Sequence, residues 1–205
     1  MTSRPRTRAK VLLRVLLAAG AILAIALVAR AYVQQNRDLE SARSDLATLD
    51  SLIPNERTNA NVVPEGESTP SPVINIDGRD YVGILEIPSL DVRLPIAASW
   101  RPESPRPGAY AGVLERGTLA IGGPNTSGQL GRLTETADGD RFTITDVTGR
   151  VFTFEVATIE TVKSDEKAKI LEKVEPWEVS LFADTFSGQE IRVLRGIAVP
   201  VFNDN

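Results

Sequence analysis

The first apolar stretch of the chain lies near the N-terminus, where residues 11–29 are apolar apart from Arg14. About 20 apolar residues suffice to cross a bilayer as a helix, so residues 11–33 are predicted to form a transmembrane anchor. Residues 1–10 are basic and are predicted to stay in the cytoplasm, which places the rest of the chain outside. A cleaved signal peptide is the alternative, but residues 30–34 lack a small-x-small cleavage pattern, which favours retention.

A polar segment separates this stretch from the rest of the chain, and residues 34–75 are predicted to be a stalk and linker. Its first part, up to residue 52, carries leucines at mostly helical spacing, which predicts that the helix continues and stops at Pro54. These leucines are Leu39, Leu46, Leu49 and Leu52. Residues 54–76 are rich in Pro, Asn, Ser and Thr and predict an extended spacer, so the folded domain is expected over residues 76–205.

The pattern of the remaining chain is that of short β-strands. Apolar and β-branched residues alternate or cluster in runs separated by turn residues, and Gly149 offers a positive φ between two of the runs. The predicted strands are residues 81–87, 92–96, 141–146, 150–156, 179–182 and 190–199, the last two joined by Ser187 and Gly188. A helix is predicted from Ser164 to about Val174, capped by Ser164 or Asp165. Many short strands with one or two short helices predict an all-β barrel or sandwich.

Charge is distributed unevenly along the chain. Residues 1–30 hold six basic and no acidic residues, which leaves 17 basic residues against 27 acidic ones and a balance of about −10 for the rest. A surface of this sign repels phosphate backbones, and no basic patch with interleaved aromatic residues is present. Nucleic acid is therefore not expected as a partner.

The chain contains neither cysteine nor histidine. This excludes disulfides, thiolate nucleophiles and Cys- or His-ligated metals, and it removes the usual general base at neutral pH. The acidic residues Asp138, Asp140 and Asp146 lie in turn sequences, which explains them better than a calcium loop does. We therefore expect no metal and no cofactor.

Four ordered blocks of the sequence resemble the sortase family. Residues 81–96 (YVGILEIPSLDVRLPI) are similar to its G-x-L-x-I-P-x-L-x-x-x-L-P-I string, and residues 119–125 (LAIGGPN) to its segment ending in Gly-His-Asn. Residues 142–156 match its central hairpin. Residues 177–185 (WEVSLFADT) resemble its W-D-L-T-L-F-T-C-T strand, and residues 191–193 the strand that carries an essential Arg. The resemblance covers residues 76–199 and is of the class B or D type.

This resemblance implies an eight-stranded β-barrel and a membrane-bound transpeptidase of Gram-positive cell surfaces. In such enzymes a Cys thiolate cleaves a sorting signal with the help of a His and an Arg. Carried over by position, the His falls on Pro124, the Cys on Asp184 and the Arg on Arg192. Proline has no ionisable group, and a carboxylate is a poor nucleophile toward an amide, so both replacements disable acyl transfer.

The leading hypothesis is thus a sortase-like pseudoenzyme, anchored in the cell membrane with its domain outside, that binds a peptide or surface-protein partner in the groove near Arg192. One alternative is an active enzyme that uses other residues; Thr185 and Ser187 lack a base that would activate them. Another is a purely structural barrel. Arg192 is either paired with Asp184 across neighbouring strands or an ordinary polar residue at the rim of the barrel.

Overall fold

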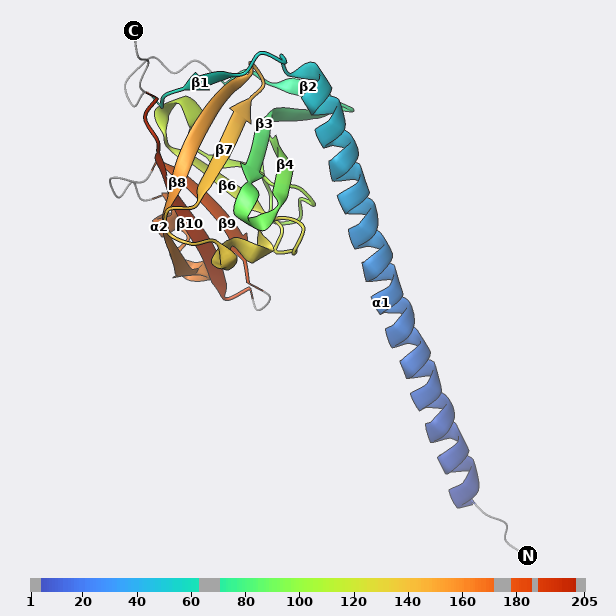
Figure 1. Ribbon diagram of the computed structural model, residues 1–205. Coiled ribbons are helices and arrows are strands. Elements are labelled where there is room, and N and C mark those ends of the chain that lie inside the picture. The colour runs from blue at the N-terminus through green and yellow to red at the C-terminus, as the bar shows by residue number, and fades with distance from the viewer. Residues whose placement is uncertain (1–4, 63–70, 172–177, 186–187, 202–205) are drawn as a thin grey trace, which may run out of the picture. The chain divides into compact units, whose positions relative to one another are not determined.

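The structure of the chain is a computed structural model that describes residues 5–62, 71–171, 178–185 and 188–201 (Figure 1). At positions 5–13, 15–17, 35, 36 and 39 it describes the backbone alone. The chain divides into two units, residues 1–40 and residues 41–205. Val174, Trp177 and Ser187, which belong to sequence predictions, lie outside the described residues, as does the spacer segment 63–70.

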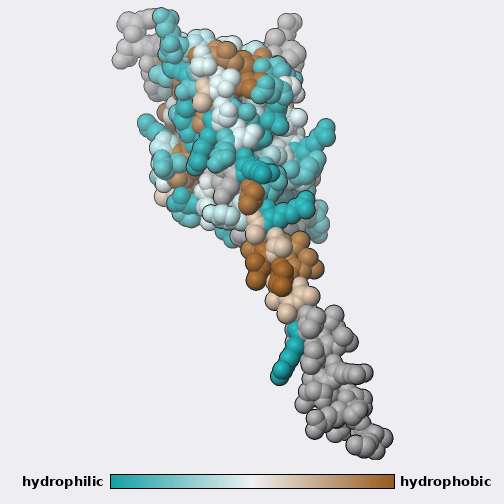
Figure 2. Space-filling model, turned by 90° about the vertical axis from the view of Figure 1, so that its right-hand side faces the viewer, coloured by the Kyte–Doolittle hydropathy of each residue, from teal (hydrophilic) through white to brown (hydrophobic). Residues whose placement is uncertain are grey.

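Helix α1 (Pro5–Leu52) is continuous through the predicted anchor and the predicted stalk. Its side chains from 18 to 34 are exposed, and their apolar members form the brown stretch of the helix in Figure 2. Within the part of the chain that is described, no helix combines the length and the apolar character that crossing a membrane requires. Positions 11–13 and 15–17 of the predicted anchor lie outside the described side chains.

Short strands and turns make up nearly all of the second unit. The strands are β1 (Thr58–Ala60), β2 (Ile74–Ile76), β3 (Arg79–Ile87), β4 (Val92–Ala97), β5 (Gly108–Ala111), β6 (Leu119–Gly123), β7 (Arg141–Asp146), β8 (Arg150–Lys163), β9 (Val179–Asp184) and β10 (Glu190–Ala198). Between them lie the 3₁₀ turns η1 (Pro88–Leu90), η2 (Leu114–Arg116), η3 (Leu130–Glu135) and η4 (Ser164–Glu166), and the helical turn α2 (Ala168–Leu171). Each strand predicted from the sequence is present.

Eight of the strands in the described ranges close into a barrel. Their order is β3-β4-β5-β6-β9-β10-β8-β7, and β7 pairs with β3 to complete the ring. Strand β8 makes the closure possible because its first half pairs with β7 and its second half with β10. The predicted β7–β8 hairpin turns at Gly149, whose φ of 89° is one that glycine adopts readily.

Apolar side chains fill the interior of the barrel, as is usual for a ring of eight strands. Leu85, Ile121, Phe142, Phe154 and Leu194 belong to this core and are buried. The turn η3 closes one end of the barrel, since its Leu130 and Leu133 join the same cluster. The all-β class predicted from the residue pattern and the eight-stranded barrel implied by the sortase resemblance are therefore confirmed.

The last turns of α1 pack against the outside of the barrel, so the folded unit starts at Ser41 rather than at the predicted residue 76. Leu49 and Ile53 are buried against Ile84 of β3 and Ala97 of β4. The spacing of the leucines correctly predicts that the helix continues to residue 52, but it does not identify the surface that covers Leu49. Strands β1 and β2 also lie within the segment that was predicted to be an extended spacer. Since they pair with β8 and β3, these parts of the segment belong to the sheet.

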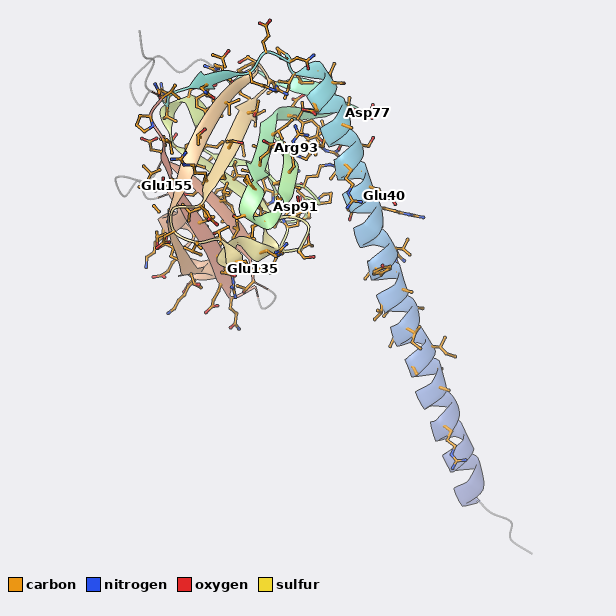
Figure 3. All side chains as sticks on the ribbon, in the orientation of Figure 1. Glu40, Asp77, Asp91, Arg93, Glu135 and Glu155 are labelled. Atoms are coloured by element: carbon orange, nitrogen blue, oxygen red, sulfur yellow. The ribbon has the colours of Figure 1, made fainter. Side chains whose placement is uncertain are left out.

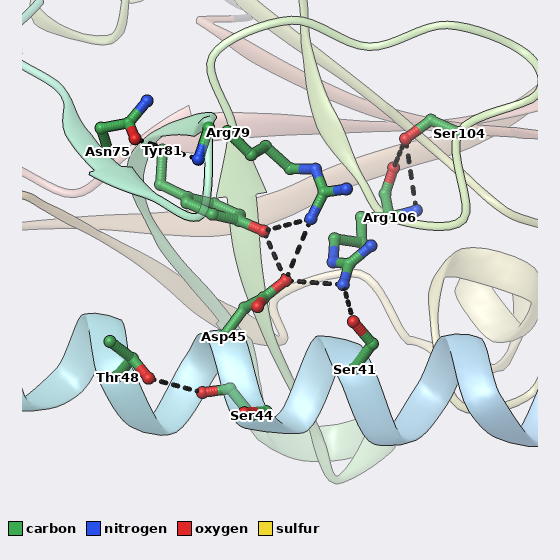
Figure 4. A network of polar contacts seen from close by, with 10 residues as sticks. Ser41, Ser44, Asp45, Thr48, Asn75, Arg79, Tyr81, Ser104 and Arg106 are labelled. Atoms are coloured by element: carbon green, nitrogen blue, oxygen red, sulfur yellow. Dashed lines mark hydrogen bonds and ion pairs between the residues drawn. The ribbon is translucent and has the colours of Figure 1, made fainter.

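A buried carboxylate fixes this end of the helix to the barrel (Figure 4). Asp45 Oδ2 accepts a hydrogen bond from the Tyr81 hydroxyl at 2.6 Å and lies 2.6 Å from Nη2 of Arg106 and 3.3 Å from Nη1 of Arg79. Arg106 also donates to the hydroxyl of Ser41. Burying Asp45 and Arg106 is tolerated because each charge has an opposite partner.

The helix predicted from Ser164 to about Val174 starts later than expected, and its predicted residues 172–174 lie outside the described residues. The chain forms η4 and then the four residues of α2, with Ile170 buried and Leu171 exposed. Ser164 does not cap the helix; its hydroxyl donates to the carbonyl of Gly188 at 2.7 Å. The pattern of a capping residue before an apolar stripe cannot show that a neighbouring loop competes for the same hydroxyl.

The Tyr81 hydroxyl offers a test of the helix attachment. Burial raises the pKa of Tyr81 above its usual value, and the hydrogen bond to Asp45 acts in the same direction. Because the folded-state pKa is the higher one, this contribution to stability is complete below pH about 10 and is lost as the pH rises through the folded-state pKa.

We expect Tyr81→Phe to lower the free energy of unfolding by about 1 kcal/mol and to remove the latest step from the absorbance titration of the three tyrosines. Tyr110→Phe, whose ring is 41% exposed, is the matched control and should leave that late step in place. A late step that persists in Tyr81→Phe would show that another tyrosine is the protected one.

Candidate functional site

The structure brings the three positions singled out by the sequence to the same end of the barrel. Strands β6 and β9 are parallel neighbours, with Gly123 opposite Ala183, so Pro124 and Asp184 lie at adjacent strand ends. Strand β10 runs antiparallel to β9 and places Arg192 opposite Ala183. Pro124 and Asp184 are half-buried, whereas Arg192 is exposed.

Arg192 and Asp184 lie on opposite faces of the sheet. Asp184 is opposite Ile191, one position away from the Arg192–Ala183 pair, and consecutive residues of a strand point to opposite faces. Arg192 shares the inward face with Leu194 and donates through Nη1 to Thr134 Oγ1 of η3 at 3.2 Å. Among the described residues no ion pair joins Asp184 to Arg192, so of the two alternatives for Arg192 the pairing with Asp184 is contradicted.

Asp184 lies on the outward face, at the edge of an aromatic cluster. Phe182, two residues earlier in β9, contacts Trp100 and Tyr110, with ring centroids 5.1 Å and 5.3 Å away and all rings edge to face. Trp100 and Tyr110 complete the triangle at 6.1 Å. Such edge-to-face pairs contribute beyond the area they bury and hold the rings in fixed orientations.

Gly122 of β6 makes the close packing of these rings possible. A β-carbon at this position would lie 2.6 Å from Phe182 Cζ and 2.6 Å from Trp100 Cδ2, which is closer than any real contact. Two of the three rings therefore rest directly on the backbone of β6. The short sequence Ile121-Gly122-Gly123 contains the signal for this approach, but the partner ring Trp100 comes from the loop after β4 and is not apparent from the sequence.

The indole N–H of Trp100 is buried. Its buried Nε1 has no hydrogen-bond partner among the described residues. A buried donor without an acceptor costs about 1–3 kcal/mol, so an acceptor supplied by a bound molecule would relieve this cost. The aromatic cluster and the Asp184 carboxylate together form a surface, which we call the aromatic face, defined by Trp100, Tyr110, Phe182 and Asp184.

A second arginine of β10, which the sequence did not single out, is the better anchored one. Arg195 is 2% exposed and forms an ion pair of 2.6 Å with Glu160 of β8. It also donates to Ser180 Oγ and to the carbonyls of Lys169 and Ile170 in α2. Arg195 thus holds α2 against the outward face of β9 and β10, and an arginine inside an apolar run is the only signal of this role in the sequence.

The acidic turn residues have the roles expected of them. Asp146 Oδ1 accepts from the backbone N–H groups of Thr148 and Arg150 at 2.8 Å and 3.0 Å, and Asp140 Oδ2 accepts from that of Ala137 at 3.0 Å. This last hydrogen bond holds the pKa of Asp140 below its usual value. Within the described part of the chain, no three acidic residues gather closely enough to bind a metal ion.

Comparison with solved structures identifies the fold. The chain is similar to sortase A from Corynebacterium diphtheriae, with a TM-score of 0.53 and 21% identity over 62% of this chain and 64% of that one. It is also similar to sortase C-1 from Actinomyces oris, with a TM-score of 0.51 and 23% identity over 60% and 76%. A third similar structure is Clostridium perfringens sortase C with the C-terminal cell wall sorting motif, with a TM-score of 0.51 and 19% identity over 60% and 72%.

The chain therefore has a sortase-like fold, and the match spans just under two thirds of the Corynebacterium enzyme. No protein-family model matches the sequence. No curated protein matches it either. These structural similarities define the fold alone.

The contact between Gly122 and the aromatic rings yields a test of the aromatic face. We expect Gly122→Ala to lower the free energy of unfolding by about 1–3 kcal/mol, because an added methyl group must displace Trp100 or Phe182. The displaced Trp100 should also shift the fluorescence maximum of the folded protein.

Gly20→Ala is the matched control, since nothing lies within 4 Å of the β-carbon that it adds. It should leave both the unfolding free energy of the barrel and the fluorescence unchanged. If Gly122→Ala behaved like this control, the packing of the rings on β6 would be contradicted.

Proposed function

We propose that this protein is a membrane-anchored, extracytoplasmic pseudoenzyme of sortase-like fold that binds a peptide or surface-protein segment on the aromatic face without cleaving or transferring it. The observation that carries the proposal is the pair Pro124 and Asp184 at the adjacent ends of β6 and β9. These are the positions at which the sequence resemblance places the His and the Cys of a sortase.

The chemistry of these two residues supports the absence of acyl transfer. A covalent transpeptidase needs a nucleophile that attacks and later leaves, and a group that protonates the departing amine. Pro124 has neither an ionisable group nor a backbone N–H, so it can do none of these tasks. Asp184 offers a carboxylate, and the chain has no cysteine or histidine at any position.

The chemistry of the aromatic face supports binding. Tyr110 is 41% exposed and extends the packed rings toward solvent, so an apolar side chain of a partner can be buried against it. Asp184 adds a carboxylate at the edge, which favours a cationic or hydrogen-bond-donating group beside that side chain. An extended segment that combines the two is the partner that this surface fits best.

A single peptide assay tests binding and turnover together. The probes are peptides that carry a C-terminal cell wall sorting motif, of the kind present in the Clostridium perfringens sortase C structure. We expect the full-length protein to release and transfer nothing from them. Because the chain has no native cysteine, Asp184→Cys introduces a single thiol, and we expect a bound peptide to slow its labelling by a maleimide.

Glu155→Cys, on the exposed side of β8, is the matched control, and its labelling should not respond to the peptide. Turnover by the native chain that is lost in Asp184→Ala would establish the active-enzyme alternative. Equal labelling of Asp184→Cys with and without every peptide, and with a membrane extract, would favour a purely structural barrel.

The proposed anchor rests on α1. Its side chains Ile22, Leu23, Ile25, Leu27 and Val28 are each 59–69% exposed, and exposed apolar side chains on all sides of a helix are stable in lipid rather than in water. The basic residues before this stretch favour an orientation with the N-terminus in the cytoplasm.

We expect the full-length chain to sediment with membranes and to resist extraction by high salt and carbonate. Deletion of residues 11–33 should release the remainder, and externally added protease should digest the barrel of intact cells from which the wall is removed. Release of the full-length chain by carbonate alone would contradict the anchor, while the peptide assay would remain unaffected.

A further inference from the structure

A cavity of about 210 Å³ lies at the opposite end of the barrel from Pro124 and Asp184. Strand β6 connects the two places: Leu119 at its start lines the cavity, and Gly123 at its end precedes Pro124. Five residues of strand separate them by about 13 Å. Ala109, which lines the cavity, packs against the barrel core, whereas the next residue of β5, Tyr110, packs on Phe182 on the outward face. The cavity and the aromatic face therefore lie on opposite sides of the sheet, and the role of the cavity is independent of the proposed function.

Most of the cavity wall is apolar. Val82, Ala109, Val113, Leu119 and Ile144 line it. Val82 lines the cavity at the position where the register of β3 against β4 shifts, between Tyr81 and Gly83, and this irregularity lets Tyr81 pack outside beneath α1 while Val82 packs against the core. An apolar cavity of about 150 Å³ accommodates benzene, so this one has room for a ring and a short substituent.

The polar part of the cavity is concentrated on one side, where Ser71, Glu115 and Asp146 line it. Asp146 already accepts four hydrogen bonds: beside the two turn hydrogen bonds, Oδ1 accepts from Thr148 Oγ1 at 2.7 Å and Oδ2 from Arg150 Nε at 2.7 Å. Glu115 is less committed. Among the described residues, its Oε1 accepts from Arg150 Nη2 at 2.9 Å and its Oε2 from Ser71 Oγ at 3.0 Å.

The charge on this side is negative. The single guanidinium of Arg150 faces the two carboxylates of Glu115 and Asp146, which leaves a balance of −1 among these three residues. Each oxygen of an ionised carboxylate can accept two hydrogen bonds, so Glu115 retains acceptor capacity toward the cavity. A positively charged donor is the group that satisfies this capacity best.

We propose that this cavity binds a small amine, in which an apolar group the size of an aromatic ring carries one ammonium group. The ring lies against Val82, Leu119 and Ile144, and the ammonium donates to Glu115 Oε2 and to the Ser71 hydroxyl. The same chemistry can be presented by a free amine or by a lysine side chain of a protein, and the experiment separates these sources.

Titration calorimetry and NMR shifts of the full-length protein with three ring compounds test the proposal. Benzylamine, benzyl alcohol and benzoate share the ring and differ in the charge of the head group. We expect benzylamine to bind about tenfold more tightly than benzyl alcohol, because a charge-assisted hydrogen bond exceeds a neutral one, and benzoate to show no binding. Equal affinity for the amine and the alcohol, or preference for benzoate, would overturn the proposal.

Two classes of variant locate the binding. Glu115→Gln should abolish the preference for the amine over the alcohol, whereas Glu155→Gln, on strand β8 and labelled in Figure 3, should preserve it. Ala109→Leu fills the cavity and should abolish binding of all three compounds, and Ala98→Leu serves the same purpose if the first variant fails to fold. Unchanged binding in a folded cavity-filling variant would contradict the assignment.

A glycine-flanked lysine peptide distinguishes the two sources of the amine. Stronger binding of benzylamine than of the peptide assigns the cavity to a free small molecule, and the reverse order assigns it to a protein side chain; either order supports amine recognition. Because the labelling of Asp184→Cys reports on the other end of the barrel, it should not respond to benzylamine.

Discussion

Strand β8 is the element on which the remaining structure depends, because it pairs with β7 along its first half and with β10 along its second. Without this double pairing the strands would form an open sheet with exposed edges and an uncovered apolar face. With it, Phe142, Phe154 and Leu194 meet in one interior, although more than 50 residues separate the first from the last. The closure also determines which residues meet at each end of the barrel.

Closure also determines which side chains of each strand point into the barrel and which point outward. This decides which residues can meet at the candidate site. Asp184 and Arg192 lie at one end of the barrel, but the register of β9 against β10 directs one outward and the other inward. The Asp184 carboxylate therefore lies on the side of the aromatic rings, while the Arg192 guanidinium donates a hydrogen bond to Thr134 of η3. A shift of β9 by one residue against β10 would turn Asp184 to the inward face beside Arg192, so the register of these two strands is what keeps the two side chains apart.

Two elements pack against the outer surface of the barrel. On one side, α1 is held by Asp45 and by the apolar contacts of Leu49 and Ile53; on another, Arg195 holds α2. Both attachments use a buried charge with several partners, an arrangement that fixes geometry because removal of any partner leaves a charge uncompensated. Phe182 of the aromatic face is buried beside Ile170 of α2, whereas Tyr110 is 41% exposed. Among the described residues, Tyr110 and the cavity therefore remain accessible beside these two attachments.

The sequence by itself determined the all-β class of the fold, six of the ten strands in the described ranges and the turn at Gly149. These follow from local alternation, turn chemistry and ordered motifs, which require no knowledge of distant contacts. It also determined the absence of thiol and imidazole chemistry, since composition alone excludes them.

Only the tertiary structure decided which surfaces these residues share. The partner of Leu49 on α1, the contact of Trp100 with Gly122 and the meeting of Ser71 with Glu115 join segments that lie tens of residues apart. Such contacts depend on strand register and barrel closure, which are properties of the whole chain. The sequence therefore established that the chain has no cysteine or histidine, and the structure showed where aromatic, acidic and apolar groups lie on the barrel.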